Sequence, residues 1–216
     1  GETWKLENSG FDRVSCLLFS SGISRDQKGN TLNSSKKILV AGGAGYIGSH
    51  AVRELDAAGF HPLIVDNLSK GHREAVLWGE LLEGDLKDAS FLERVFREHK
   101  IQGVMHFASK CYVGESMEYP AEYYEENLSS ALTLLRAMLK QGVKNFIFSS
   151  SCATYGNPVS LPLGESHPQD PVNPYGETKY FIERILKHYH RAYGLRFCAL
   201  RYFNAAGASL DARIGE

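Results

Sequence analysis

Short apolar runs alternate with longer stretches of helical periodicity along most of the chain, and this alternation limits the folds that it can adopt. The runs do not alternate apolar with polar residues, so each predicts a strand buried on both faces. We expect six such strands, at residues 37–41, 61–65, 80–83, 103–107, 145–148 and 195–200. We expect the main helices at residues 46–58, 88–100, 120–141 and 175–193. This order predicts an α/β fold, a doubly wound parallel sheet with strand order 3-2-1-4-5-6.

The first 35 residues differ in character from the rest. They are rich in Ser, Asn and Gly, and the apolar cluster at 14–19 is too short for a signal peptide. We therefore expect residues 1–35 to be a leader or linker that is poorly ordered. Residues 36–216 are expected to hold the folded domain.

The composition excludes several classes of partner. Lys and Arg number 24 against 25 Asp and Glu, so a formal net charge of -1 provides no positive field for nucleic acid. No apolar run approaches the roughly 20 residues of a membrane helix. The cysteines are widely spaced and fit no zinc motif, which predicts reduced thiols in a cytoplasmic protein; they are Cys16, Cys111, Cys152 and Cys198.

A glycine-rich turn joins the first predicted strand to the first helix. Gly42, Gly45 and Gly48 form a G-x-x-G-x-x-G pattern, which lets backbone N–H groups and a helix N-terminus approach a pyrophosphate. Asp66 ends the second strand, where a carboxylate can accept hydrogen bonds from ribose hydroxyls and repel a 2′-phosphate. The pattern predicts a dinucleotide site that prefers NAD over NADP.

Polar residues also follow the later strands, at the edge of the sheet where ligands bind. Asp85 follows the third strand and can accept from an adenine amino group, although a simple loop or capping role is equally compatible with its position. A serine cluster ending in Ser151 follows the fifth strand and can hold a substrate hydroxyl or carbonyl. Tyr175 and Lys179 lie four residues apart at the start of a helix, so they share one face. A tyrosine with a reference pKa of about 10 becomes a useful base when nearby cations favour its phenolate, so we expect Lys179 to lower the pKa of Tyr175.

These motifs together identify a resemblance. Residues 37–216 resemble the extended short-chain dehydrogenase/reductase family, and within it the 4-epimerases acting on UDP-glucose and other UDP-sugars. The resemblance rests on AGGAGYIGSH, DNLSKGH, GDL, HFASKCYVGES, YPAEYYEENL, FIFSSSCATYG, NPYGETK and LRYFNAAGA. It implies an NAD-binding Rossmann domain followed by the start of a substrate-binding region. Because family members run well beyond Glu216, we expect that most of the substrate domain is missing.

The resemblance also implies roles for individual residues. It implies catalytic roles for Ser151, Tyr175 and Lys179. It implies that the cofactor-binding residues are Gly42, Gly45, Tyr46, Ile47, Gly48, Asp66, Asn67, Asp85, Leu86, Phe107, Ala108, Ser109, Asn127, Tyr175, Lys179 and Phe203. It implies that Ser151, Tyr175 and Asn204 contact the UDP-sugar. His188 and His190 are two apart on a helix and point to different faces, so we expect no metal site.

The implied reaction is NAD-dependent epimerisation at C4 of a UDP-sugar through a transient 4-keto intermediate, with UDP-glucose and UDP-galactose as the first choice. The implied assembly is a homodimer built on the helices near residues 120–141 and 175–193. Cys111 stands where many epimerases carry Lys, so a UDP-pentose is an alternative substrate. A dehydratase or decarboxylase is a second alternative, although Cys152 and Ala153 occupy the place of its acidic residue. A catalytically incompetent NAD-binding fragment is the third.

Overall fold

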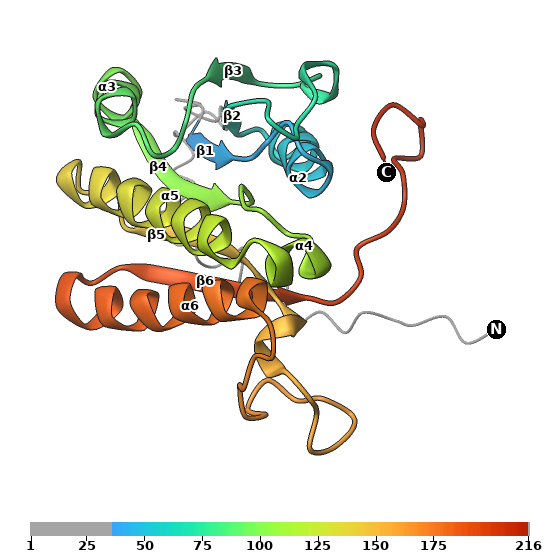
Figure 1. Ribbon diagram of the computed structural model, residues 1–216. Helices are drawn as coiled ribbons and strands as arrows, with labels where there is room; N and C mark the ends of the chain where they lie inside the picture. Colours follow the sequence, from blue (N-terminus) through green and yellow to red (C-terminus); the bar gives the residue numbers. More distant parts are fainter. Residues whose placement is uncertain (1–35, 216) are drawn as a thin grey trace, which may run out of the picture.

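A six-stranded parallel sheet organises the chain in the computed structural model, which describes residues 36–215 (Figure 1). Its strands are β1 (Lys37–Ala41), β2 (His61–Asp66), β3 (Glu80–Glu83), β4 (Ile101–His106), β5 (Asn145–Ser151) and β6 (Arg196–Tyr202). They lie in the order β3-β2-β1-β4-β5-β6, and every neighbouring pair is parallel. The predicted α/β class and strand order are confirmed.

Within residues 36–215, five α-helices connect the strands, and two of the five begin with a side-chain cap. The five helices are α2 (Tyr46–Ala57), α3 (Ala89–Glu98), α4 (Val113–Glu118), α5 (Pro120–Lys140) and α6 (Pro174–Tyr193), with short 3₁₀ turns η1 (Arg73–Ala75) and η2 (Cys152–Tyr155). The Asp88 side chain accepts from two amides at the start of α3. Asn173 accepts from the Gly176 amide, Pro174 takes the first position of α6, and Gly194 ends that helix in the left-handed region.

Two hydrophobic cores lie on opposite faces of the sheet. The larger one packs α3, α5 and α6 against the strands and includes Phe91, Leu134 and Ile182. The smaller one packs Val52 and Leu55 of α2 against the other face. Helices therefore cover both faces of the sheet. The loops at the carboxyl ends of the strands are left to form a binding site.

The structure differs from the predicted elements mainly at their ends. β5 continues through the serine cluster to Ser151, and β6 continues to Tyr202, because the two strands pair along this whole length. Helix α4 was not expected, since six residues are too few to show a helical period. The expected leader or linker at residues 1–35 lies outside the described residues.

Candidate functional site

The glycine turn after β1 requires glycine at two positions. Gly42 has a positive φ of 81°, and a Cβ there would overlap the backbone of Ala108. A Cβ on Gly48 would overlap the carbonyl oxygen of Gly42. Gly45 is the N-cap of α2 and contributes no side-chain cap, so the amides of the first turn are not covered by a capping group. The turn thus presents backbone donors and the positive end of α2 to an anion.

The carboxylate of Asp66 organises the loops beside this turn. Its Oδ2 accepts from the Ala44 amide at 3.0 Å, and its Oδ1 accepts from the Leu68 amide at 2.9 Å. The carboxylate therefore joins the glycine turn to the loop after β2. Each carboxylate oxygen has a second lone pair, so these bonds are compatible with an added acceptor role toward a ribose.

Asn67 and Asp85 connect the ends of β2 and β3. Asn67 Nδ2 donates to Asp85 Oδ2 at 3.1 Å, and Asp85 Oδ1 accepts from the Lys87 amide at 2.7 Å. Leu86, which follows Asp85, is buried. Asn67 and Asp85 thus form a polar pair at the ends of β2 and β3, next to the buried Leu86.

The loop after β4 is tied to the glycine turn and to α5. Phe107 and Ala108 both donate their amides to the carbonyl oxygen of Ala41. Asn127 is buried, accepts from the Lys110 amide at 2.8 Å, and donates to the Lys110 carbonyl and to Thr178 Oγ1, both at 3.1 Å. The amide of Asn127 is thus committed to holding this loop against α5 and α6, which gives the residue a positioning role besides the predicted cofactor contact.

Ser151 and Tyr175 meet at the end of β5. Ser151 Oγ accepts from the Ala153 amide at 3.1 Å, and the Ser151 hydroxyl lies near the Tyr175 phenol. Burial raises the pKa of Tyr175 above its usual value, and this outweighs the nearby Ser151 hydroxyl, which lowers the pKa. The structure therefore differs from the expected lowering of this pKa, because burial of the phenol dominates.

Lys179 lies one turn after Tyr175 and is buried, whereas Tyr175 is half-buried. Its Nζ donates to the Ser149 carbonyl at 2.8 Å and lies 5.6 Å from the centre of the Tyr175 ring. Burial lowers the pKa of Lys179 to about 8. The ammonium thus lies near the Tyr175 ring, and the Ser149 carbonyl engages only one of its three donors.

His106, at the end of β4, is a buried residue that sequence reasoning missed. Its ring stacks with Phe148 at 5.9 Å between centres, and Lys179 Nζ lies 5.1 Å from the centre of the same Phe148 ring. Nδ1 of His106 is buried without a hydrogen-bond partner. Burial, followed by the charge of Lys179, lowers the pKa of His106 to about 3, so the imidazole is neutral at pH 7.

The predicted site residues gather at one edge of the sheet although they are far apart in sequence. Tyr46 opens α2, and its hydroxyl donates to the Gly207 carbonyl at 2.7 Å, which brings the segment after β6 to the glycine turn. Ile47 follows Tyr46 in the first turn of α2, and Ser109 lies in the loop after β4. Phe203 and Asn204 directly follow β6 and are exposed, with no described contact to the serine cluster.

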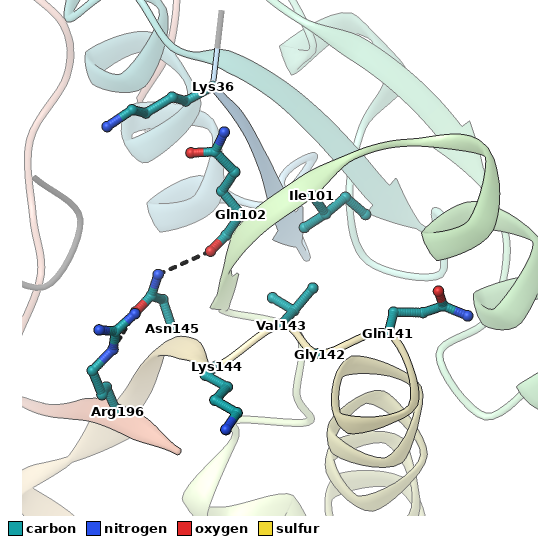
Figure 2. Close-up of a pocket in the computed structure, with 9 residues that line it drawn as sticks. All are labelled: Lys36, Ile101, Gln102, Gln141, Gly142, Val143, Lys144, Asn145 and Arg196. Atoms are coloured by element: carbon teal, nitrogen blue, oxygen red, sulfur yellow. Dashed lines mark hydrogen bonds between the residues drawn. The ribbon is translucent and has the colours of Figure 1, made fainter. Parts of the chain in front are cut away.

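A separate cavity of about 510 Å³ lies at the opposite edge of the sheet, where β4, β5 and β6 begin. Asn145 donates to the Gln102 carbonyl at 3.0 Å and accepts from Arg196 at 2.9 Å. Lys36, Lys144 and Arg196 point in different directions in Figure 2, so their charges do not converge on one ligand position. We therefore assign the candidate site to the carboxyl ends of the strands.

Residues 36–215 lack two kinds of feature. None of the helices there has both the length and the apolar character needed to cross a bilayer. The same residues contain no group of three or more His, Cys, Asp or Glu side chains arranged to hold a metal ion.

Sequence reasoning also missed Glu183, which is buried beside the site, and its half-buried partner Arg201. Glu183 follows Lys179 by four residues and Tyr175 by eight, so this helical spacing was an available signal. Arg201 stands within the LRYFNAAGA stretch, where only the following residues drew attention.

Comparisons with known proteins agree with this geometry. Residues 38–214 match the NAD dependent epimerase/dehydratase family. A UDP-glucose 4-epimerase of Rhizobium meliloti (strain 1021) is 52% identical over 182 residues, covering 84% of this chain and 56% of that protein. The crystal structure of UDP-glucose 4-epimerase from Brucella ovis in complex with NAD has a TM-score of 0.83 at 49% identity, covering 84% of this chain and 56% of that one. The corresponding enzyme from Bifidobacterium longum, in complex with NAD+ and UDP, has a TM-score of 0.81 at 40% identity, covering 84% and 57%. The chain thus spans about half the length of the relatives that it matches.

Proposed function

Because the chain belongs to the NAD dependent epimerase/dehydratase family, we propose that it takes part in NAD-dependent epimerisation at C4 of a UDP-sugar. The names of the relatives, UDP-glucose 4-epimerases, support UDP-glucose and UDP-galactose as the sugars. The observation that carries the proposal is the grouping of Ser151, Tyr175 and Lys179 at the carboxyl edge of the sheet, with the open glycine turn at the same edge.

The residues present fit NAD. A Cβ on Gly42 or Gly48 would overlap the chain's own backbone, so these glycines permit the tight turn that would place backbone donors and the start of α2 beside a pyrophosphate. Asp66 stands at the end of β2 with its carboxylate held by two amides, which suits a ribose with two free hydroxyls and opposes a 2′-phosphate. Asn67, Asp85 and Leu86 would border the adenine, and the loop at 107–109 with Phe203 would border the nicotinamide half.

The catalytic roles follow from the positions of three side chains. Tyr175 would take the proton from the sugar 4-hydroxyl and later return it, while Ser151 would hydrogen-bond the 4-oxygen and relay that proton. Lys179 would hold the nicotinamide ribose with the donors that Ser149 leaves unused. When bound, NAD supplies the acceptor and then the donor of the C4 hydride. Asn204 would contact the UDP-sugar.

An elimination reaction is less well supported by the same residues. A dehydratase needs an acid beside the sugar, and the residues that follow Ser151 in η2 are Cys152 and Ala153, which provide no carboxylate. Epimerisation needs only the proton transfer that Tyr175 and Ser151 offer, so it remains the proposal. A UDP-pentose stays a substrate to be tested beside UDP-glucose.

The test has a binding arm and a turnover arm. Titration calorimetry should detect NAD binding to this chain, and incubation with NAD and UDP-glucose or UDP-xylose should yield the C4 epimer. Tyr175→Phe should keep NAD affinity, because the ring remains, and should lower kcat by roughly 10²-fold or more, the scale of a lost acid–base group. Full epimerisation by Tyr175→Phe would contradict the mechanism. NAD binding without turnover would support the cofactor site and leave a non-catalytic NAD-binding chain as the conclusion.

A further inference from the structure

A partly buried ion pair connects α6 to β6 beside the candidate catalytic residues. Glu183 is 2% exposed and projects from α6 toward Arg201 of β6. Arg201 Nε donates to Glu183 Oε1 at 3.0 Å, and Nη2 donates to Oε2 at 2.8 Å, so the pair is bidentate.

Further polar groups complete the network around this pair. Ser150 Oγ donates to Glu183 Oε1 at 2.6 Å, and Gln169 Nε2 donates to Oε2 at 3.0 Å. Arg201 Nη1 donates to the Tyr155 hydroxyl at 2.9 Å and to the Glu165 carbonyl at 3.0 Å. Burial alone would raise the pKa of Glu183, but the bonds from Arg201, Ser150 and Gln169 lower it below its usual value, so the carboxylate is ionised.

Stability does not by itself explain such a pair. The cost of removing two charges from water often cancels their attraction, and apolar residues of similar volume can stabilise a protein equally well. A bidentate pair differs from an apolar contact because it fixes distance and orientation together. The pair between Glu183 and Arg201 therefore fixes how α6 sits against β6.

The residues of this network are close in sequence to the candidate catalytic residues. Ser150 directly precedes Ser151 on β5. Glu183 follows Lys179 by four residues and Tyr175 by eight on α6, so all three project from one side of the helix. The bond from Ser150 to Glu183 thus joins the strand that carries Ser151 to the helix that carries the other two groups.

We propose that Glu183 and Arg201 are positioning residues that hold α6 in register on the end of β5, and so align Tyr175 and Lys179 with Ser151. The proposal rests on the proposed function, since it assigns a task to these three side chains. Neither member of the pair contacts the Tyr175 phenol or the Lys179 ammonium in the described hydrogen bonds, so they act through the backbone elements that they join.

The decisive variant is Glu183→Leu combined with Arg201→Met, which removes both charges and keeps apolar volume. We expect its melting temperature to stay within a few degrees of the parent chain. We also expect the titration midpoint of Lys179, about 8 in the parent, to rise by at least about one unit toward 10.5, because a displaced helix exposes the ammonium. NMR of a chain with ¹³C-labelled lysine would measure it, and Lys179→Met would assign the resonance. NAD affinity should fall about tenfold, since Lys179 would be misplaced.

The outcomes separate positioning from simple stabilisation. A double variant with parental stability, an unchanged Lys179 midpoint and unchanged NAD affinity would overturn the proposal. If the double variant fails to fold, Arg201→Lys replaces it: the charge stays, the bidentate geometry is lost, and an unchanged midpoint in the folded variant would again overturn the proposal. The midpoint requires no cofactor, so it decides the inference even if the parent chain does not bind NAD. Glu93→Gln, which breaks the exposed pair with Lys140 at 2.9 Å, is the control that should change neither readout.

Discussion

Two ionisable side chains on the larger-core side of the sheet have pKa values that burial shifts away from their values in water. Lys179 and His106 both lie against the Phe148 ring, and burial lowers the pKa of each, to about 8 and about 3. Because the His106 imidazole is neutral at pH 7, Lys179 carries the positive charge of this pair near the Tyr175 phenol. The local charge at the site is thus set by burial as much as by residue type.

His106 should make the stability of the chain depend on pH. Its folded pKa of about 3 lies below the unfolded value of 6.5, so the unfolded chain takes up a proton that the folded chain does not. Stability is therefore lost as the pH falls from 6.5 toward 3, and the loss between pH 7 and pH 5 should be about 2 kcal/mol. Urea unfolding at both pH values would measure it. His106→Phe should remove most of this difference, and an equally steep loss in that variant would show that another group is responsible.

Asp66 is expected to set the choice between NAD and NADP. Asp66→Asn keeps an oxygen for one of the two amide bonds to Ala44 and Leu68 but removes the charge that opposes a 2′-phosphate. The preference for NAD should shrink about tenfold, or about 1.4 kcal/mol. Calorimetry with both cofactors measures the ratio, and a ratio that stays constant would remove Asp66 from this role.

At the scale of secondary structure, the strands and long helices could be predicted because each shows a clear pattern over several residues. Helix α4 could not, since six residues show no period. The extension of β5 through Ser151 depends on pairing with β6, which local sequence does not reveal. The internal partners of Asn127 depend on three elements meeting, so the sequence predicted its location but not its hydrogen bonds.

The turn between β1 and α2 should tolerate no side chain at Gly48. In Gly48→Ala the added Cβ would meet the Gly42 carbonyl, so the turn must shift. We expect a loss of about 1–3 kcal/mol in stability and a clear loss of NAD affinity. Gly164→Ala is the matched control, because a Cβ there has no neighbour within 4 Å. Thermal unfolding and calorimetry on both variants would measure this, and equal behaviour of the two would contradict the steric explanation.

For the whole molecule, the outer surface of α5 and α6 is the candidate interface. The two helices lie side by side in Figure 1, and Tyr124 of α5 lies 6.5 Å from Phe181 of α6 between ring centres. Phe181 also stacks with Tyr180, and Phe181 is 37% exposed. This small aromatic cluster adds to the reasons for proposing a homodimer through these helices.

A charge in that cluster should disrupt the dimer. Phe181→Glu places a carboxylate where two copies would bury aromatic rings, so sedimentation should show the dimer of the parent chain and a monomer for the variant. Lys187→Glu is the control for charge alone. Lys187 is exposed on the same helix, and its replacement makes the net charge more negative by two, against one for Phe181→Glu. A parent chain that is monomeric at high micromolar concentration would contradict the proposal.

The ion pair between α6 and β6 also bears on how the chain is made. Arg201 stands on β6, which follows the other five strands of this sheet in the chain, so the ribosome makes its partner Glu183 and the side chains near it earlier. Until Arg201 has left the exit tunnel, the carboxylate lacks the guanidinium that lets it be buried, and β5 has β4 but not β6 as a neighbour in the sheet. During synthesis, the glycine turn can therefore form early, while the arrangement around Tyr175 is completed only when β6 docks.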